Sequence, residues 1–207
     1  MAGMSAGRAD RAAVILCGGK SSRMGRPKAL LPFGPEPLLV RVLRACGEAC
    51  AELVVVAAPG QELPPLPAGA HVVRDAMEGQ GPLEGLAAGL AAVRAPAAFC
   101  VSCDAPFLRP ALVERMFDAL GKAAAVQAVV NGRVEPLGAV YRTALAGKAA
   151  RLVREGRRKV VEIAVGEEIR EMREPELRAA DPDLSSFRNC NTPEEYARAL
   201  HDAGWGS

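Results

Sequence analysis

The fold of this chain is decided by residues 13–31, whose sequence is AVILCGGKSSRMGRPKALL. The apolar run Val14-Ile15-Leu16 is typical of a buried strand, and the glycine pair Gly18-Gly19 follows it closely. The next nine positions contain the cations and hydroxyls Lys20, Ser21, Ser22, Arg23, Arg26 and Lys28. Glycines let backbone N–H groups approach an anion, and cations neutralise its charge. The stretch therefore predicts a strand followed by a polyphosphate-binding loop.

Two common phosphate-binding motifs do not fit this loop. A Walker A motif needs G-x-x-x-x-G-K-[ST], but Gly19 and Gly25 are one residue too far apart, and Arg26-Pro27 stands before Lys28. The dinucleotide motif G-x-G-x-x-G is not matched either. A solvated basic turn is the remaining structural interpretation. The glycines, hydroxyls and four cations directly after a buried strand favour phosphate binding over it.

The composition is that of an ordinary soluble protein. With 207 residues the chain can form one domain around a single core, and its 26 basic and 24 acidic residues give a formal net charge of +2. This charge gives no support for a nucleic-acid or membrane-surface partner, and no apolar run approaches the ~20 residues of a membrane helix. Residues 1–11 lack the apolar core of a secretory signal. We expect them to be a disordered lead-in to a single domain over 12–202, and the protein to be cytoplasmic.

Strand and helix patterns alternate over the first 120 residues. Strands are expected at 12–17, 53–57, 71–73 and 99–102, and helices at 37–50, 82–93 and 110–120. This alternation predicts an α/β protein with a mostly parallel, Rossmann-like sheet covered by helices on both faces. Ligands bind beyond the carboxyl ends of such strands. The glycine loop, Asp75 and Asp104 all follow strand ends and should share one rim.

The second half of the chain has a less regular pattern. Asn131-Gly132 is a strong hairpin signal between two strands, and Thr192, Pro193 and Glu195 form a capping box that opens the last helix. Residues 167–180 are charged and give no clear prediction. The expected elements are strands at 123–130, 134–141 and 160–165 and a helix at 143–154.

Asp104 is the strongest candidate metal ligand. It ends a buried strand and is followed by Ala105-Pro106, which suits a hard divalent cation. Mg²⁺ takes one or two protein carboxylates and completes its shell with substrate phosphate oxygens. A helix N-cap is the alternative, but the next helix begins too far away, at Pro110. Asp75 could hold a ribose hydroxyl or a second metal contact, or it could cap a turn.

Three further groups have both a functional and a structural interpretation. Gly81, beside Pro82, indicates either a loop where the backbone approaches a ligand or an ordinary junction between a loop and a helix. Asn189 and Asn191 flank Cys190 and would point to the same side of an extended chain, toward substrate or metal. Asn191 could instead support the last helix. The run from 157 to 159, Arg-Arg-Lys, could bind a second anion or form a solvated charged turn.

The cysteines and histidines do not indicate covalent chemistry. The six cysteines lie in apolar or small-residue contexts and are expected to be free thiols. Cys100 and Cys103 lie on a strand pattern that points them to opposite faces, and they have no second C-x-x-C or His partner. His71 and His201 are too sparse for a nucleophile–base pair, and there is no G-x-S-x-G motif.

Residues 16–28 resemble the L-A-G-G-x-S-x-R-M-G-x-x-K signature of the MobA-like nucleotidyltransferases. Further similar stretches occur in the same order: Gly81 to Gly85, Cys103 to Pro106, Glu135 to Leu137, Gly156 to Val160 and Asn189 to Glu195. The combination with the last two stretches resembles the molybdenum cofactor guanylyltransferase branch. The resemblance covers roughly residues 12–200 and implies a three-layer α/β/α fold of the nucleotide-diphospho-sugar transferase type.

The resemblance also implies a reaction. GMP would pass from GTP to the terminal phosphate of molybdopterin, with Mg²⁺ as cofactor, and the product would go to molybdoenzymes or their chaperones. Arg23, Lys28 and Asp104 would be catalytic, with Asp104 as the metal ligand. The nucleotide, held by the N-terminal half, would contact Leu16, Cys17, Gly18, Gly19, Ser22, Lys28, Asp75, Gly81 and Asp104. The acceptor, held by the C-terminal half, would contact Arg158, Asn189 and Asn191.

Two departures from the family pattern leave other functions open. Cys17 replaces the usual alanine, and Ala57-Ala58-Pro59 stands where the family often has an asparagine that contacts the nucleotide. A cytidylyltransferase acting on molybdopterin or another phosphorylated acceptor would keep the same chemistry, although the Gly18-Gly19 pair favours the guanylyl branch. A non-catalytic nucleotide-binding module is an alternative of another class, against which the combination of Lys28 and Asp104 argues.

Overall fold

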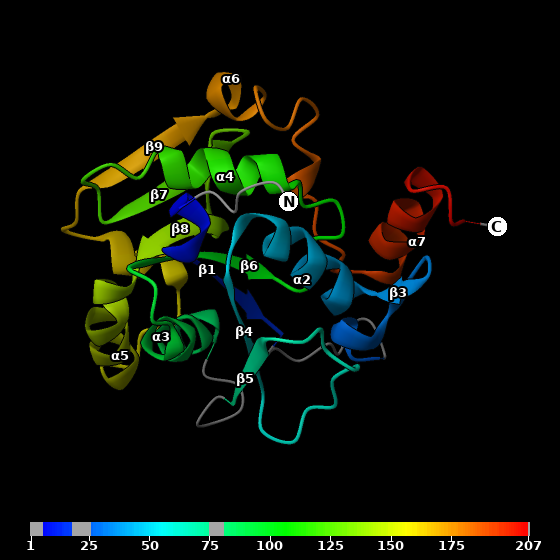
Figure 1. The fold of residues 1–207 in the computed structure, drawn as a ribbon, viewed down its shortest axis with the longest axis horizontal. Helices are drawn as coiled ribbons and strands as arrows, with labels where there is room; N and C mark the ends of the chain where they lie inside the picture. Colours follow the sequence, from blue (N-terminus) through cyan, green and yellow to red (C-terminus); the bar gives the residue numbers. More distant parts are fainter. Residues whose placement is uncertain (1–5, 18–25, 75–80, 207) are drawn as a thin grey trace.

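The computed structural model describes residues 6–17, 26–74 and 81–206. Its centre is a seven-stranded sheet in the order β5-β4-β1-β6-β8-β7-β9 (Figure 1). The strands are β1 (Arg11–Leu16), β4 (Glu52–Ala57), β5 (Ala70–Arg74), β6 (Ala97–Ser102), β7 (Ala125–Val130), β8 (Arg133–Arg142) and β9 (Ile169–Arg173).

The sheet is mostly parallel, as the sequence predicts. The strands β5, β4, β1 and β6 pair in parallel, and so do β7 and β9. The strand β8 is antiparallel to both of its neighbours, because it returns from β7 through the Asn131-Gly132 turn. From β1 the chain first builds β4 and β5 on one side and then adds β6 on the other side. The strand order therefore reverses between β1 and β6, where α/β sheets bind their ligands.

Helices cover both faces of the sheet, which confirms the three-layer α/β/α prediction (Figure 1). Ala13 and Ile15 of β1 pack on one face with α2 (Leu38–Ala49) and α4 (Pro110–Asp118). Val14 and Leu16 pack on the other face with α3 (Pro82–Ala92) and α5 (Ala146–Arg154). This alternation buries β1 on both sides and makes it the central strand. No helix in the described ranges is both long enough and apolar enough to span a membrane.

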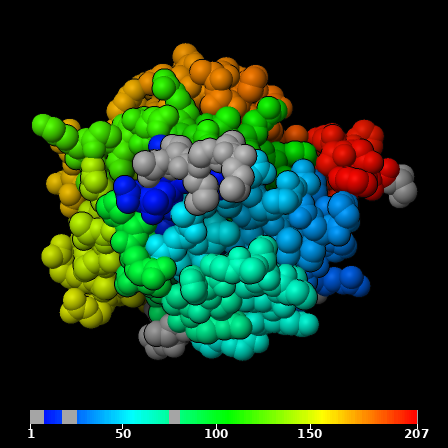
Figure 2. All heavy atoms as spheres, in the orientation of Figure 1, coloured from blue at the N-terminus to red at the C-terminus, as the bar shows by residue number. Residues whose placement is uncertain are grey.

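The last helix packs beside a small hairpin. The strands β2 (Pro32–Phe33) and β3 (Glu36–Pro37) pair with each other, and Phe33 and Leu38 share a small core with Cys190 and Ala199. In Figure 2, α7 (Pro193–Asp202) lies at the margin of the molecule. The predicted capping box of Thr192 and Glu195 is present at its start. This contact brings the end of the chain back toward the N-terminal half.

The predicted strand at 160–165 is wrong. Residues Val160–Ala164 form a 3₁₀ helix, η3, and Val160 and Ile163 are both buried in the core on the α3 side. Side chains three residues apart lie on the same side of a 3₁₀ turn, whereas on a strand they would point to opposite faces. The apolar run therefore follows a three-residue period, which its hydrophobicity alone does not reveal. The other 3₁₀ turns are η1 (Lys28–Leu30), η2 (Thr143–Leu145) and η4 (Ser185–Phe187).

Several short elements lie where no regular structure was predicted. The edge strand β9 has the sequence IREMR, and only Met172 on it is buried. An edge strand needs few apolar side chains, so the charged sequence of β9 lacks the apolar pattern that predicts a strand. The short helix α6 (Glu174–Leu177) follows β9 directly. At the other end, Ala6–Ala9 form the helical turn α1 and Arg11 begins β1. Residues 1–5 lie outside the described residues, so the lead-in expected over 1–11 stays a prediction there.

The cysteines are confirmed as free, buried thiols. Cys100 belongs to the core on the α3 side of the sheet, and Cys103 belongs to the core on the α2 side. The two side chains therefore lie on opposite faces, as their spacing predicts, and they cannot act together as a redox or zinc pair.

The close packing of α3 on β1 depends on Gly89. A Cβ atom at this position would lie 2.3 Å from Cγ1 of Val14 and 3.1 Å from Cγ2 of Val56. We expect Gly89→Ala to lower the free energy of unfolding by about 1–3 kcal/mol, because the helix must move away from the sheet. Urea denaturation measures this change.

The matched control is Gly147→Ala on α5, where a Cβ atom would meet nothing within 4 Å. This substitution should be neutral or stabilising by up to about 1 kcal/mol, because alanine favours a helix over glycine. Equal stability of Gly89→Ala and the wild type would contradict the close contact between α3 and β1.

Candidate active site

The site is built at the carboxyl ends of β1 and β6. The backbone N–H of Cys103 donates to the carbonyl of Leu16 over 3.0 Å, which continues the ladder one step past the two strands. The N–H of Cys17 donates in the same way to Val56 on β4, over 2.8 Å. These bonds fix Cys17 and Asp104 at the reversal point of the sheet, which is the rim predicted for the site.

Lys28 joins three distant segments of the chain at this rim. It begins the 3₁₀ turn η1, and its Nζ donates to Oδ2 of Asp104 over 2.5 Å and to Oδ1 of Asn191 over 2.9 Å. The Asp104 side chain is only 4% exposed and the Lys28 side chain 19%. The structure thus brings together Lys28, Asp104 and Asn191, three of the residues predicted for the site.

One carboxylate oxygen of Asp104 lacks a hydrogen-bond partner among the described residues. This oxygen, Oδ1, is buried. A buried carboxylate oxygen without a partner is costly unless a ligand satisfies it. No group of three or more metal-ligating side chains occurs in the part of the chain that the structure describes. The unpartnered oxygen of Asp104 suits a cation such as Mg²⁺, which takes few protein ligands and otherwise uses phosphate oxygens and water.

Asn191 is held in place by the start of α7. Its backbone N–H donates to Oε2 of Glu195 over 2.7 Å, and the N–H of Cys190 donates to the carbonyl of Asp104 over 3.0 Å. The Asn191 side chain is therefore not the cap of the helix, and its carbonyl oxygen is directed to Lys28. The capping box fixes the segment that delivers this amide to the site.

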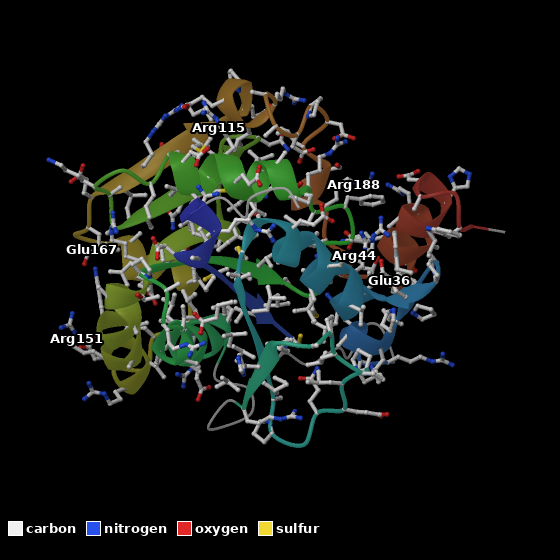
Figure 3. The ribbon with its side chains drawn as sticks, in the orientation of Figure 1. Glu36, Arg44, Arg115, Arg151, Glu167 and Arg188 are labelled. Carbon is white, nitrogen blue, oxygen red and sulfur yellow. The ribbon has the colours of Figure 1, made fainter. Side chains whose placement is uncertain are left out.

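Asn189 lies beside a cavity next to this cluster. The cavity has a volume of about 400 Å³. It is lined by Asn189 and Asn191, by Glu135 of β8, by Phe187 of η4 and by Arg198 of α7. Arg188 also lines it, extends toward α7 (Figure 3) and donates to Oδ2 of Asp202 over 2.6 Å. Phe187 and Arg198 belong to no recognisable motif, so the sequence alone does not predict that they line this cavity.

Gly81 and Arg158 contact each other at the start of α3. Gly81 has a φ of +91°, and a Cβ atom there would lie 3.1 Å from the carbonyl oxygen of Arg158. The N–H of Leu83 donates to the same oxygen over 3.4 Å. A predicted nucleotide contact and a predicted acceptor contact are thus neighbours. Neither Gly81 nor Arg158 lines the cavity beside Asn189.

Gln61 provides an amide near the place where the family asparagine is missing. Its Nε2 donates to the carbonyl of Cys17 over 3.0 Å, and its Oε1 accepts from the N–H of Ala58 over 3.0 Å. Gln61 thus connects the carboxyl ends of β1 and β4. Gln61 lies four residues beyond the strand, in a proline-rich connection, so no local motif marks it as a site residue.

The pKa values of the Cys17 and Cys190 thiols are both raised above the usual range. The hydrogen bond with Cys103, followed by burial, raises the pKa of Cys17 well above its usual value, and Asp104 raises it further. Burial is the main cause that raises the pKa of Cys190 to about 12. Because the thiolate is the reactive form, neither residue is suited to nucleophilic attack or metal binding. Leu16 and Cys17 are both buried at the carboxyl end of β1.

Five predicted contacts lie outside the described residues. They are Gly18, Gly19, Ser22 and Arg23 of the phosphate loop, and Asp75. Their roles stay predictions from the sequence.

Comparison with known proteins identifies the family. The MobA-like NTP transferase domain matches residues 13–171, which include all of the large sheet except the first two residues of β1 and the last two of β9. The chain belongs to this family. A relative from Mycobacterium tuberculosis, named "Probable molybdenum cofactor guanylyltransferase", is 41% identical over 158 residues, which are 72% of this chain and 76% of the relative. This MobA-like protein is therefore a nucleotidyltransferase.

Solved structures confirm the fold type. Molybdopterin-guanine dinucleotide biosynthesis protein A from Archaeoglobus fulgidus has a TM-score of 0.76 at 22% identity, over 93% of this chain and 98% of that one. The 2-C-methyl-D-erythritol 4-phosphate cytidylyltransferase from Thermus thermophilus has a TM-score of 0.71 at 22% identity, with the same two coverages. The MobA-like chain thus has the predicted nucleotide-diphospho-sugar transferase fold.

The buried ion pair makes a prediction about stability. Lys28→Met leaves the Asp104 carboxylate without its cation, and we expect the free energy of unfolding to fall by about 3 kcal/mol. Adding Asp104→Asn removes the unpaired charge, so the double variant should be more stable than Lys28→Met alone. Urea denaturation without nucleotide or divalent cation measures both effects.

Lys122→Met is the matched control, because Lys122 is exposed in the turn after α4. It should change the stability by less than about 0.5 kcal/mol. Wild-type stability of Lys28→Met, or a double variant less stable than the single one, would contradict the importance of the ion pair.

Proposed function

We propose that this MobA-like protein transfers GMP from GTP to the terminal phosphate of molybdopterin. The products are pyrophosphate and the guanine dinucleotide form of the molybdenum cofactor. The observation that carries the proposal is the pair of hydrogen bonds from Lys28 to Asp104 and Asn191. They join a residue of the phosphate loop, a candidate metal ligand and a candidate acceptor contact at one rim. The name of the Mycobacterium tuberculosis relative supports the same activity.

The reaction is a single displacement at phosphorus. An oxygen of the acceptor phosphate forms a bond to the α-phosphorus of GTP, and the bond between this phosphorus and the bridging oxygen breaks as pyrophosphate leaves. The ammonium of Lys28 would neutralise charge on the phosphates, and Asn191 orients that ammonium. Arg23 and the backbone N–H groups of 18–22, outside the described residues, are proposed to assist. The N-terminal half would hold the nucleotide and the C-terminal half the acceptor.

Asp104 is proposed to hold Mg²⁺ through the carboxylate whose Oδ1 has no protein partner. When bound, the cation would neutralise the triphosphate and help to align it. With a nucleotide present, Lys28 would share its charge between Asp104 and phosphate oxygens. Leu16, Cys17 and Gln61 at the ends of β1 and β4 are proposed to contact the base and ribose, together with Asp75 and Gly81. Arg158 and Asn189 are proposed to contact the acceptor.

We further propose that the protein works in the cytoplasm and passes its product to molybdoenzymes or their chaperones. The guanine dinucleotide is a finished cofactor form, so a recipient protein must take it from this enzyme.

A pyrophosphate-release assay tests the proposed function. With Mg²⁺ and molybdopterin, we expect release with GTP and much less with ATP, CTP or UTP, and no release without the acceptor. Lys28→Met and Asp104→Asn should each lower kcat by about 10²–10³-fold, because each removes charge stabilisation at the transferred phosphate. Lys122→Met should retain the wild-type rate.

Three outcomes would contradict the proposal. Release with CTP but not GTP would indicate the cytidylyl alternative. Binding of GTP without any release would indicate a non-catalytic module. A wild-type rate in Asp104→Asn would remove the metal assignment.

A further inference from the structure

Glu135 is a half-buried carboxylate whose role the transfer chemistry leaves unexplained. It lies on β8, in the Glu135-Pro136-Leu137 stretch, and lines the cavity beside Asn189. Its side chain makes no hydrogen bond or ion pair with any described residue. Burial raises its pKa, and the charge of Arg133 opposes this shift only in part. The carboxylate thus lacks the donors that would stabilise its ionised form.

The other groups in the cavity are those that bind a flat heterocycle. The ring of Phe187 packs against the backbone of Gly138, where a Cβ atom would lie 3.2 Å from Cε1 of the ring. Gly138 has a φ of +81°, so a side chain is disfavoured there for two reasons. Phe187 thus contacts β8 at Gly138 and also lines the cavity. An aromatic ring fixed in this way can stack on a planar ligand.

The polar groups around the ring have complementary chemistry. Glu135 can only accept hydrogen bonds when ionised, and its two oxygens can accept from two parallel N–H donors. The Asn189 amide can donate to a ring carbonyl, and Arg198 supplies a cation against an anionic ligand. A volume of about 400 Å³ suits a small organic ligand of two or three fused rings.

The cavity is placed for the acceptor and not for GTP. Asn191 lines the cavity and also accepts the hydrogen bond from Lys28, so the cavity adjoins the transfer site on the α7 side. Leu16, Cys17 and Gln61 are not among the residues that line it. A ligand in the cavity could therefore extend a phosphate toward Lys28 while the nucleotide occupies the ends of β1 and β4.

We propose that Glu135 binds the N–H edge of the acceptor's pterin ring, formed by the 2-amino group and N3–H, and thereby selects the acceptor. This inference rests on the proposed function, which supplies a pterin as the acceptor. Phe187 stacks on the ring and Asn189 donates to its 4-oxo group. Glu135 is a specificity residue, since it lies in the acceptor cavity and not at the phosphorus.

A pair of ligands without the phosphate tests this assignment. Binding of 6-hydroxymethylpterin and 6-hydroxymethyllumazine is measured by isothermal titration calorimetry. The lumazine carries an oxo group in place of the 2-amino donor. Wild-type protein should bind the pterin about 10–100-fold more tightly, because the lumazine lacks one bond to the carboxylate. Glu135→Gln should bring this ratio close to one, whereas Phe187→Leu should weaken both ligands together.

The control is Glu168→Gln, which removes an exposed carboxylate beside β9 and should preserve the wild-type ratio. In the transfer assay, Glu135→Gln should raise the KM for molybdopterin about 10–100-fold and leave the KM for GTP unchanged.

The two proposals fail in different ways. A wild-type pterin-to-lumazine ratio in Glu135→Gln, or no binding of either ligand to the wild type, would overturn the role of Glu135 even if GMP transfer to molybdopterin occurs. Absence of GMP transfer with the expected ratios intact would overturn only the proposed function.

Discussion

The site depends on the buried ion pair between Lys28 and Asp104. The carboxylate is almost fully buried and needs a cation, and Lys28 provides it while also donating to Asn191. These two hydrogen bonds hold together η1, the end of β6 and the segment before α7. A preorganised cation beside a metal-ligating oxygen suits the stabilisation of a transferring phosphate, since little reorganisation is needed during the reaction.

The sheet topology explains why these residues can meet. The strands β1 and β6 are neighbours because the chain builds one side of the sheet before the other, and their carboxyl ends open at the reversal point. The β2–β3 hairpin and α7 then form a small core beside this opening. The ion pair of Arg44 with Glu36, over 2.8 Å, supports the hairpin from α2 (Figure 3). Packing at the edge of the molecule thereby places Asn191 at the centre of the site.

Local patterns predict the central features well. Short continuous apolar runs identify β1, β4 and β6, and Asp104 is expected at the rim because it follows such a run. The run at 160–165 misleads because a 3₁₀ turn also buries apolar residues at close spacing. The cavity could not be predicted, because Glu135, Phe187 and Arg198 come from separate elements and only the antiparallel return of β8 and the docking of α7 bring them together. A cavity that forms only when distant elements pack together leaves no pattern in the local sequence.

The most direct measurement of the central claim follows the phosphorus atoms of GTP. The enzyme is incubated with Mg²⁺, molybdopterin and GTP that carries ³²P at either the α or the γ position. Attack at the α-phosphorus predicts that α label enters the dinucleotide product and that γ label is recovered entirely in pyrophosphate. Recovery of γ label in the organic product, or of α label only in GTP and its hydrolysis products, would contradict the account.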